Sequence, residues 1–272
     1  MIPGKTHLLL ITGLVCLLLS GCAGQRWADP LAEEEQAETT RVIAAMQEVE
    51  QECPDSLDAD VLLFWKSPLD DWAVEGYIQL LSPSFIKFVI SNPLGQPVYA
   101  FASDGIRFQI LHPRQYQHIR GTVRTLAIRK EIPQILVQGN WFTYLTGRLP
   151  ADFPEVIEVN RDASDTTIWI RVSPPDSDKI LESIWVHVNP LQKTVLGYLF
   201  LDSSGETLAE IVYGEQQERS DGCKLRDAVR ITGLPWGAEL EIQLKSINTS
   251  NTYSKKDFSL PVPPGYTTQL HH

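Results

Sequence analysis

The chain has 272 residues, with 34 Asp and Glu against 23 Lys and Arg, which gives a formal net charge of −11. Hydrophobic residues make up 43% and charged residues 21%, as in a globular protein rather than a disordered one. The acidic balance argues against a nucleic-acid binder and against a polybasic membrane-surface module, because both need clustered Lys and Arg. No apolar run in the expected mature chain is long enough to span a bilayer, which excludes a polytopic membrane protein.

The N-terminus has the pattern of an export signal. A short polar region precedes an apolar run over residues 8–19, which is typical of a signal-peptide core and too short for a stable membrane span. The run ends in Leu19-Ser20-Gly21-Cys22, which resembles the lipobox of bacterial lipoproteins, where the cysteine is acylated. We therefore expect residues 1–21 to be a lipoprotein signal peptide and Cys22 to be the lipid anchor. A plain secretory signal is the alternative.

The segment after the cysteine predicts where the mature protein is anchored. Residues 22–29 are expected to form a lipidated tether, and residues 30–272 a single domain. Ala23 rather than Asp follows the cysteine, which by resemblance to the sorting rule of Gram-negative lipoproteins favours the outer membrane. The anchor is then expected in the inner leaflet, with the protein facing the periplasm. Three acyl chains hold firmly, because each buried methylene contributes about 0.8 kcal/mol.

Two further cysteines, Cys53 and Cys223, remain in the expected mature chain. In an oxidising periplasm such an isolated pair is a candidate disulfide. Closing a loop of this length contributes roughly 4–5 kcal/mol in the chain-entropy model. Two unpaired buried thiols are the alternative. A metal site is disfavoured, because no CxxC or HxxxH spacing accompanies either cysteine.

A helix is the first element expected after the tether. Asp29 is the expected cap, Pro30 the first helical residue, and glutamates follow at the positive end of the helix dipole, so the helix is predicted over 30–52. From about residue 60 the apolar period changes from 3.6 to 2, which indicates strands. They are predicted at 61–65, 74–81, 85–91, 98–102 and 106–112, with a short strand at 115–120 and a tight turn at Asp104-Gly105.

The alternation stops in the middle of the chain and then resumes. Residues 132–149 hold several aromatic side chains and indicate one or two short helices, interrupted at Gly139. After residue 155, strands are predicted at 168–172, 184–188, 194–202, 207–214, 227–232 and 239–245. Hairpins are expected at Ser203-Ser204-Gly205 and at Asp221-Gly222.

This order of elements decides the fold class. About eleven strands with few helices between them exclude a doubly wound α/β fold, which needs a helix after almost every strand. The prediction is an α+β, mainly β fold: one large curled antiparallel sheet, a half-open barrel, with an N-terminal helix and inserted helices as a lid. Two or three helices cap such a concavity without filling it, so an apolar cavity is expected. A conventional filled core is the alternative.

One segment resembles a known family. Residues 85–95, FIKFVISNPLG, resemble the outer-membrane lipoprotein receptor LolB and its relatives, in which a strand of alternating basic and apolar residues runs into Asn-Pro-Leu-Gly. Gly147-Arg148-Leu149-Pro150 resembles the helix-to-strand junction of that family. Phe258 with Pro263-Pro264-Gly265 resembles the last strand of the wider LolA-like group. The resemblance covers about residues 40–265 as an order of elements, and the pair Cys53 and Cys223 departs from it.

The resemblance implies a carrier without a cofactor. Its cavity would hold acyl chains of lipoproteins or lipids, received from a periplasmic LolA-like carrier and passed to the outer membrane. Leu94, between Pro93 and Gly95, would protrude on the loop that hands over the cargo. The residues expected in the cavity or the lid are Ile86, Phe88, Ile90, Phe108, Ile110, Ile135, Leu136, Trp141, Phe142, Tyr144, Leu145, Ile168 and Ile170.

The carrier has one main alternative. A non-enzymatic sensor or assembly module that binds a protein through the same fold is the alternative. Enzymatic chemistry is not expected, because the sequence contains no GxSxG, HExxH or Walker motif. His112 and His118 lie near a predicted turn, where a solvated hairpin is favoured over a metal site. His187 has no readable carboxylate or nucleophile partner.

Overall fold

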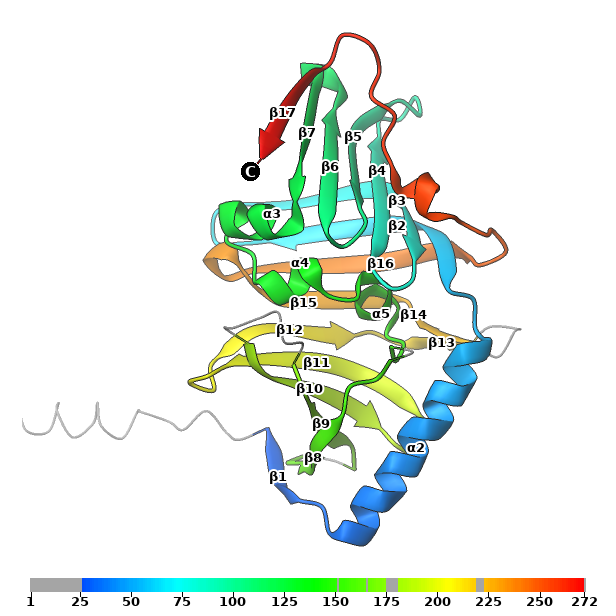
Figure 1. Ribbon diagram of the computed structural model, residues 1–272, viewed down its shortest axis with the longest axis vertical. Helices are drawn as coiled ribbons and strands as arrows, with labels where there is room; N and C mark the ends of the chain where they lie inside the picture. The colour runs from blue at the N-terminus through cyan, green and yellow to red at the C-terminus, as the bar shows by residue number, and fades with distance from the viewer. Residues whose placement is uncertain (1–25, 151, 165, 175–180, 219–222, 272) are drawn as a thin grey trace, which may run out of the picture.

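The structure, a computed structural model, describes residues 26–150, 152–164, 166–174, 181–218 and 223–271 (Figure 1). The expected signal peptide, Cys22 and the Asp221-Gly222 hairpin lie outside the described residues. Within the described part of the chain, no helix is both long and apolar enough to cross a membrane.

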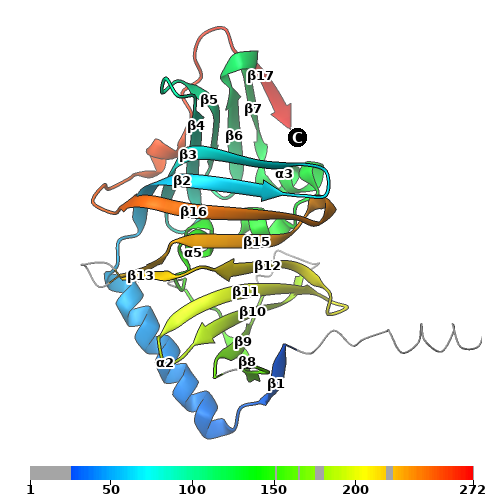
Figure 2. The ribbon, with the colours of Figure 1, turned by 180° about the vertical axis from the view of Figure 1, so that it is seen from behind.

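Fifteen strands of the described chain form one strongly curled sheet (Figures 1 and 2). All neighbours pair antiparallel except β7 and β17, which are parallel. Across the sheet the order is β1 (Trp27–Pro30), β8 (Val156–Asp162), β9 (Ile168–Val172), β10 (Leu181–Asn189), β11 (Thr194–Asp202), β12 (Thr207–Tyr213), β15 (Ala228–Leu234), β16 (Ala238–Asn248), β2 (Ser56–Lys66), β3 (Asp71–Leu81), β4 (Phe85–Ser91), β5 (Pro97–Ser103), β6 (Arg107–His112), β7 (Gln117–Thr122) and β17 (Thr267–His271). A separate ribbon pairs β13 (Gln216–Glu218) with β14 (Lys224–Arg226).

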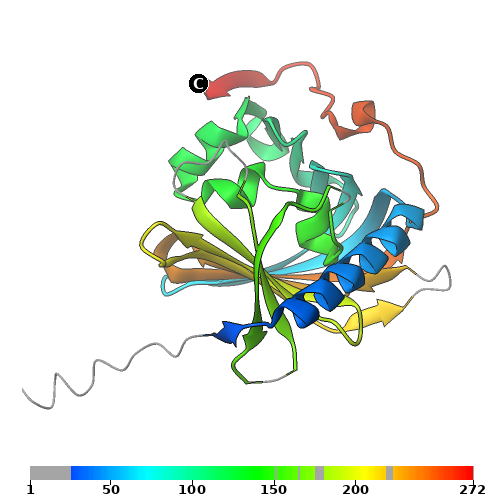
Figure 3. The same ribbon diagram turned by 60° about the horizontal axis from the view of Figure 1, so that its bottom comes forward.

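The helices lie on the concave side of this sheet (Figure 3). They are α2 (Glu33–Glu52), α3 (Val123–Lys130), α4 (Gln134–Gln138) and α5 (Trp141–Thr146), with 3₁₀ turns η1 (Pro113–Gln115), η2 (Pro235–Gly237) and η3 (Lys255–Phe258). The mainly β sheet with a few helices is confirmed. The predicted number of about eleven strands was wrong. The short strands β1, β17, β13 and β14 show no clear alternation of apolar and polar residues, and no separate strand was predicted over the residues of β8.

The predicted start of the first helix was also wrong. Pro30 belongs to β1, and Ala32 is the residue that precedes the first helical turn. Leu31 is buried, and its N–H donates to the carbonyl of Val159 in β8 at 2.9 Å. Pairing at the sheet edge therefore outweighs the local Asp-Pro helix signal. Helix α3 was not predicted. It follows β7 directly and is capped by Thr122, whose Oγ1 accepts from the N–H of Thr125.

The apolar core has two main parts, one under each half of the curved sheet. One half of the curled sheet, called here the second half, consists of β8 to β12 and β15 and packs on α2 and α4. The first half, from β16 to β4, packs on α5. Tyr144 of α5 belongs to the former cluster, and Phe142 and Leu145 belong to the latter. Since burial of each large apolar side chain contributes about 1.5–3 kcal/mol, α5 is held firmly between the two halves.

The convex face of the sheet is partly covered rather than uniformly wet. The chain after β16 crosses it, and Leu260 packs on Ala100, Ala102 and Leu111. At the other end, the ring of Trp27 in β1 stacks on Trp185 in β10, with centroids 4.1 Å apart. Trp27 and Leu260 therefore each cover part of the convex face, while β1 and β17 form the two edges of the sheet.

Cys53 and Cys223 form a disulfide in the structure, with their Cα atoms 5.7 Å apart. Cys53 caps the C-terminus of α2, and Cys223 directly precedes β14. The bond thus ties α2 to the β13–β14 ribbon across a sequence separation of 170 residues.

Candidate functional site: a cavity beneath the helical lid

Helices α4 and α5, with the residues that join them, are called the lid here. A cavity of about 630 Å³ lies between this lid and the concave face of β9 to β11. Val172, Ile184, Val186 and Tyr198 contribute its floor from the strands. Ile135 of α4 together with Asn140, Thr143 and Tyr144 covers it from the lid. The volume lies within the range of about 300–1,000 Å³ that is usual for small-molecule sites.

The lid owes its shape to the sequence around Gly139. A Cβ at this position would lie 2.2 Å from the ring of Tyr144 and 2.5 Å from the carbonyl oxygen of Ile135. Only glycine therefore lets the chain fold back between α4 and α5 with Tyr144 packed against it. Asn140 then begins α5, because its Oδ1 accepts from the N–H of Thr143 at 3.0 Å. The interruption predicted at Gly139 is confirmed.

Two buried phenols, Tyr144 and Tyr198, line the inner side of the cavity, and Tyr213 packs against Tyr198 outside the lining. The rings of Tyr144 and Tyr198 meet edge to face with centroids 5.5 Å apart. The Tyr198 hydroxyl donates to the carbonyl of Arg148, and the Tyr213 hydroxyl to that of Thr143. Burial raises the pKa of Tyr144, Tyr198 and Tyr213 well above the ordinary value of 10. These groups stay neutral at physiological pH, so the inner wall carries no charge.

The only charged side chains in the described lining of the cavity are two carboxylates at its rim. Asp152 and Glu155 are exposed there, and neither Lys nor Arg lines the cavity. A ligand carboxylate or phosphate at this mouth would meet like charge, which is unfavourable. The arrangement therefore suits a neutral apolar chain.

A buried ion pair joins the lid to α2. Arg148, which follows α5, is 7% exposed. Its Nε donates to the Glu50 carboxylate, and its Nη2 donates to the Glu50 carbonyl at 2.8 Å. The guanidinium also lies over the Phe142 ring, 5.1 Å from the centroid. Burial raises the pKa of Glu50 above 4.5, although the charge and hydrogen bond of Arg148 oppose that rise.

The predicted cavity residues are all on described elements, but the structure brings few of them to the cavity. Ile135 and Tyr144 line it. Leu136, Ile168 and Ile170 are buried in the core of the second half, and Ile86, Phe142 and Leu145 in that of the first half, against which Phe88 and Trp141 pack. Phe108 and Ile110 pack beside α3, and Ile90 is half-buried in β4.

Sequence reasoning did not assign Val172, Ile184, Val186, Tyr198 or Phe153 to the site. Ile184 and Val186 alternate along their strand in the same way as Ile168 and Ile170, so the period marked them as inward-facing. The pattern could not tell which inward-facing positions pack tightly and which border a space. Phe153 follows the lid in a segment without regular structure, where no periodic signal exists.

Leu94 is 83% exposed on the turn between β4 and β5. The turn is fixed by Asn92, whose Oδ1 accepts from the N–H groups of Leu94 and Gln96, both at 3.0 Å. Gly95 has φ of +77°, which favours glycine. The β4–β5 connection lies at the end of the molecule opposite β1 in two views (Figures 1 and 2).

His187 is not among the described residues that line the cavity. His187 lies on the convex face, where its ring stacks on Trp169. Its Nε2 is 2.7 Å from Thr167 Oγ1 and 3.6 Å from Asp162 Oδ2. Among the described residues, no group of three His, Cys, Asp or Glu side chains could hold a metal ion.

Comparison with known proteins places the fold. No protein-family model and no curated protein matches the chain. Its structure is similar to a domain assigned to outer membrane lipoprotein sorting from Vibrio parahaemolyticus, with a TM-score of 0.58 and 11% identity over 81% of this chain and 97% of that one. It is also similar to a LolA superfamily protein from Nitrosomonas europaea, with a TM-score of 0.56 and 13% identity over 80% and 97% of the two chains.

The fold is LolA-like. A DUF1329 family protein from Desulfovibrio piger has a similar fold, with a TM-score of 0.57 and 11% identity over 85% of this chain and 98% of that one. The LolA-like resemblance expected from the sequence is therefore confirmed at the level of the fold.

Proposed function

We propose that this protein is a lipid-anchored outer-membrane lipoprotein whose cavity binds acyl chains during transfer of lipoproteins or lipids. The observation that carries the proposal is the 630 Å³ cavity, with its uncharged inner wall and its lack of lysine and arginine. An acyl chain needs apolar surface and no countercharge. Residues 1–21 would be the signal peptide, and Cys22 would hold the protein at the periplasmic face of the outer membrane.

Such a transfer requires no covalent chemistry. Each methylene that leaves water for an apolar site contributes about 0.8 kcal/mol, in a protein cavity as in a bilayer. A chain can thus move between a soluble carrier, this cavity and the membrane without a large difference in free energy. The exposed Leu94, held between Pro93 and Gly95, is the proposed handoff loop. The Vibrio parahaemolyticus domain with a similar fold is assigned to lipoprotein sorting, which agrees with this role.

Native mass spectrometry tests the proposal. A non-acylated protein starting after Cys22, purified from a Gram-negative host, should carry co-purified lipid or take up added acylated peptide. Ile184→Trp places a larger ring on the floor of the cavity and should abolish uptake. Val212→Trp adds similar bulk at a 43% exposed position of β12 and should bind as the unmodified protein does. An apo mass that stays unchanged with every added acyl ligand would contradict the carrier.

A protein-binding sensor or assembly module is the second candidate. The observation that favours it is the fastening of the lid, which Arg148 ties to α2, while the disulfide ties α2 to the β13–β14 ribbon. A lid that never opens would leave the outer surface as the functional part. The same protein would then show a saturable protein partner and no acyl ligand.

A further inference from the structure

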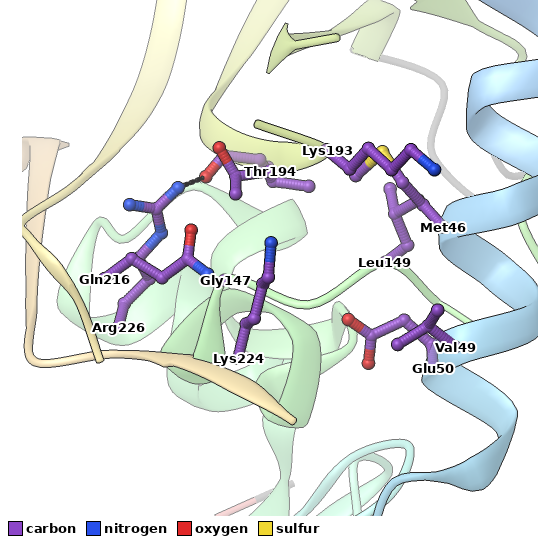
Figure 4. A pocket seen from close by; sticks show the side chains of 11 residues that line it. Met46, Val49, Glu50, Gly147, Leu149, Lys193, Thr194, Gln216, Lys224 and Arg226 are labelled. Atoms are coloured by element: carbon purple, nitrogen blue, oxygen red, sulfur yellow. Dashed lines mark hydrogen bonds between the residues drawn. The ribbon is translucent and has the colours of Figure 1, made fainter. Parts of the chain in front are cut away.

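A second, smaller cavity of about 80 Å³ lies between α2, the β10–β11 turn and the β13–β14 ribbon (Figure 4). Its apolar wall comes from Met46, Val49 and Leu149. The segment after α5 separates the two cavities, because Gly147 and Leu149 line this one and Pro150 lines the one beneath the lid. The small cavity is therefore a neighbour of the proposed acyl site and not part of it.

Three cations line this small cavity in a chain whose net charge is −11. They are Lys193 from the β10–β11 turn and Lys224 and Arg226 from β14. Lys224 donates to the carbonyl of Gln192 at 3.0 Å, and none of the three forms an ion pair within the described part of the protein. The one carboxylate in the lining, Glu50, already pairs with Arg148. The lining thus holds three cations and one carboxylate that is already paired.

Arg226 is the most informative of these cations, because it is only 6% exposed. Its guanidinium donates to the carbonyls of Gly214 and Val195 and lies 5.9 Å from the centre of the Tyr213 ring. A guanidinium has five N–H donors, so these contacts leave donors unused. Asp227 is a nearby opposite charge, but among the described residues it forms no ion pair with Arg226, so a bound anion would give the buried guanidinium a direct charged partner.

Thr194 supplies an independent observation. It is 5% exposed and lines the same cavity, and its Oγ1 has no hydrogen-bond partner among the described residues. Buried hydroxyls in folded proteins are nearly always hydrogen-bonded. Figure 4 shows Lys224 entering the space between Thr194 and Glu50. An acceptor beside the Lys224 ammonium would satisfy both the hydroxyl and the free donors of Arg226.

We propose that this small cavity binds a phosphate group, with Lys224 and Arg226 neutralising its charge and Thr194 donating a hydrogen bond. Several cations and a hydroxyl line one small space. A phosphate group has several acceptor oxygens, so it can accept hydrogen bonds from more than one of these donors at once. The apolar wall of Met46, Val49 and Leu149 suits the short carbon stem of a phosphate ester. A phospholipid headgroup and a soluble phosphate ester share this chemistry.

Isothermal titration at low and high salt tests the site with three probes: inorganic phosphate, glycerol 1-phosphate and dihexanoylphosphatidylglycerol below its micellar concentration. Lys224→Met and Thr194→Val should each weaken binding of at least one probe by about tenfold, as expected for loss of a charge-assisted hydrogen bond. Lys245→Met, the same change at an exposed position of β16, should leave binding unchanged. Binding should weaken at high salt.

The outcomes separate this site from the acyl cavity. Binding of phosphate or glycerol 1-phosphate that Ile184→Trp does not alter would identify a soluble ester as ligand. If only dihexanoylphosphatidylglycerol binds, and both Lys224→Met and Ile184→Trp weaken its binding, the ligand is a phospholipid headgroup. This outcome rests on the proposed carrier function. Lipid binding that only Ile184→Trp weakens would overturn the phosphate site while preserving the carrier. Absence of binding by all three probes at millimolar concentration would also overturn it.

Discussion

Arg148 is the residue on which the position of the lid depends most directly. Replacing it with Met removes its bonds to Glu50 and leaves a carboxylate buried without its partner. Removing one member of a buried pair typically costs about 3–5 kcal/mol, so Arg148→Met should lower the free energy of unfolding by that amount. Guanidinium denaturation measures it. Arg41→Met breaks the exposed pair with Glu38 and should change stability by less than about 0.5 kcal/mol. Equal effects would show that the Arg148 pair is no stronger than a surface pair.

Glu50 makes the stability of the protein depend on pH. Burial raises its pKa in the folded state above the ordinary 4.5, so the folded protein retains this proton to higher pH than the unfolded chain does. Stability must then fall as pH rises from about 4.5 through the folded pKa. Glu50→Gln cannot ionise and lacks this fall. The stability difference between the variant and the wild type should therefore grow with pH, as measured by denaturation at several pH values. A difference that stays constant would show that burial does not shift this pKa.

At the scale of elements, the disulfide fastens the C-terminus of α2 to β14. The double variant Cys53→Ser with Cys223→Ser should lose about 2–5 kcal/mol, because the bond restricts a long loop in the unfolded chain. The variant should have a lower denaturation midpoint than the unmodified protein. Reductant should lower the midpoint of the unmodified protein by the same amount and should leave the midpoint of the variant unchanged. Reduction without any shift would mean that the bond does not constrain unfolding.

The helices and strands also differ in how well the sequence predicts them. Strand β4 was predicted with its observed bounds, because alternating Ile86, Phe88 and Ile90 mark one face. The break at Gly139 was also predicted from local chemistry. The position of β1 was not, because its pairing depends on β8, more than a hundred residues away. The cavity depends on how Ile184 and Tyr198 meet the lid across the fold, and no local period carries that information.

At the scale of the whole molecule, the sheet places β1 and the β4–β5 connection at opposite ends (Figure 1). Three residues separate Cys22 from Arg26, so the lipid anchor reaches at most about 14 Å beyond the described chain. A compact chain of this size has a radius of gyration of about 18 Å, and a sphere with that radius of gyration is about 46 Å across. While β1 stays paired with β8, an upright body therefore holds Leu94 away from the bilayer in which Cys22 is proposed to sit.

This geometry predicts that the proposed handoff loop around Leu94 meets the membrane only after β1 is released. In the acylated protein on vesicles, a fluorophore on Ala163→Cys, next to β1, should be quenched by nitroxide lipids, and one on Leu94→Cys should not. Trp27→Ala removes the ring that stacks on Trp185 and should increase quenching at position 94, because a freed β1 lengthens the tether. Tyr116→Ala, remote from β1, should have no such effect. Strong quenching at position 94 with Trp27 intact would show that the body lies on its side, and that release of β1 is not required.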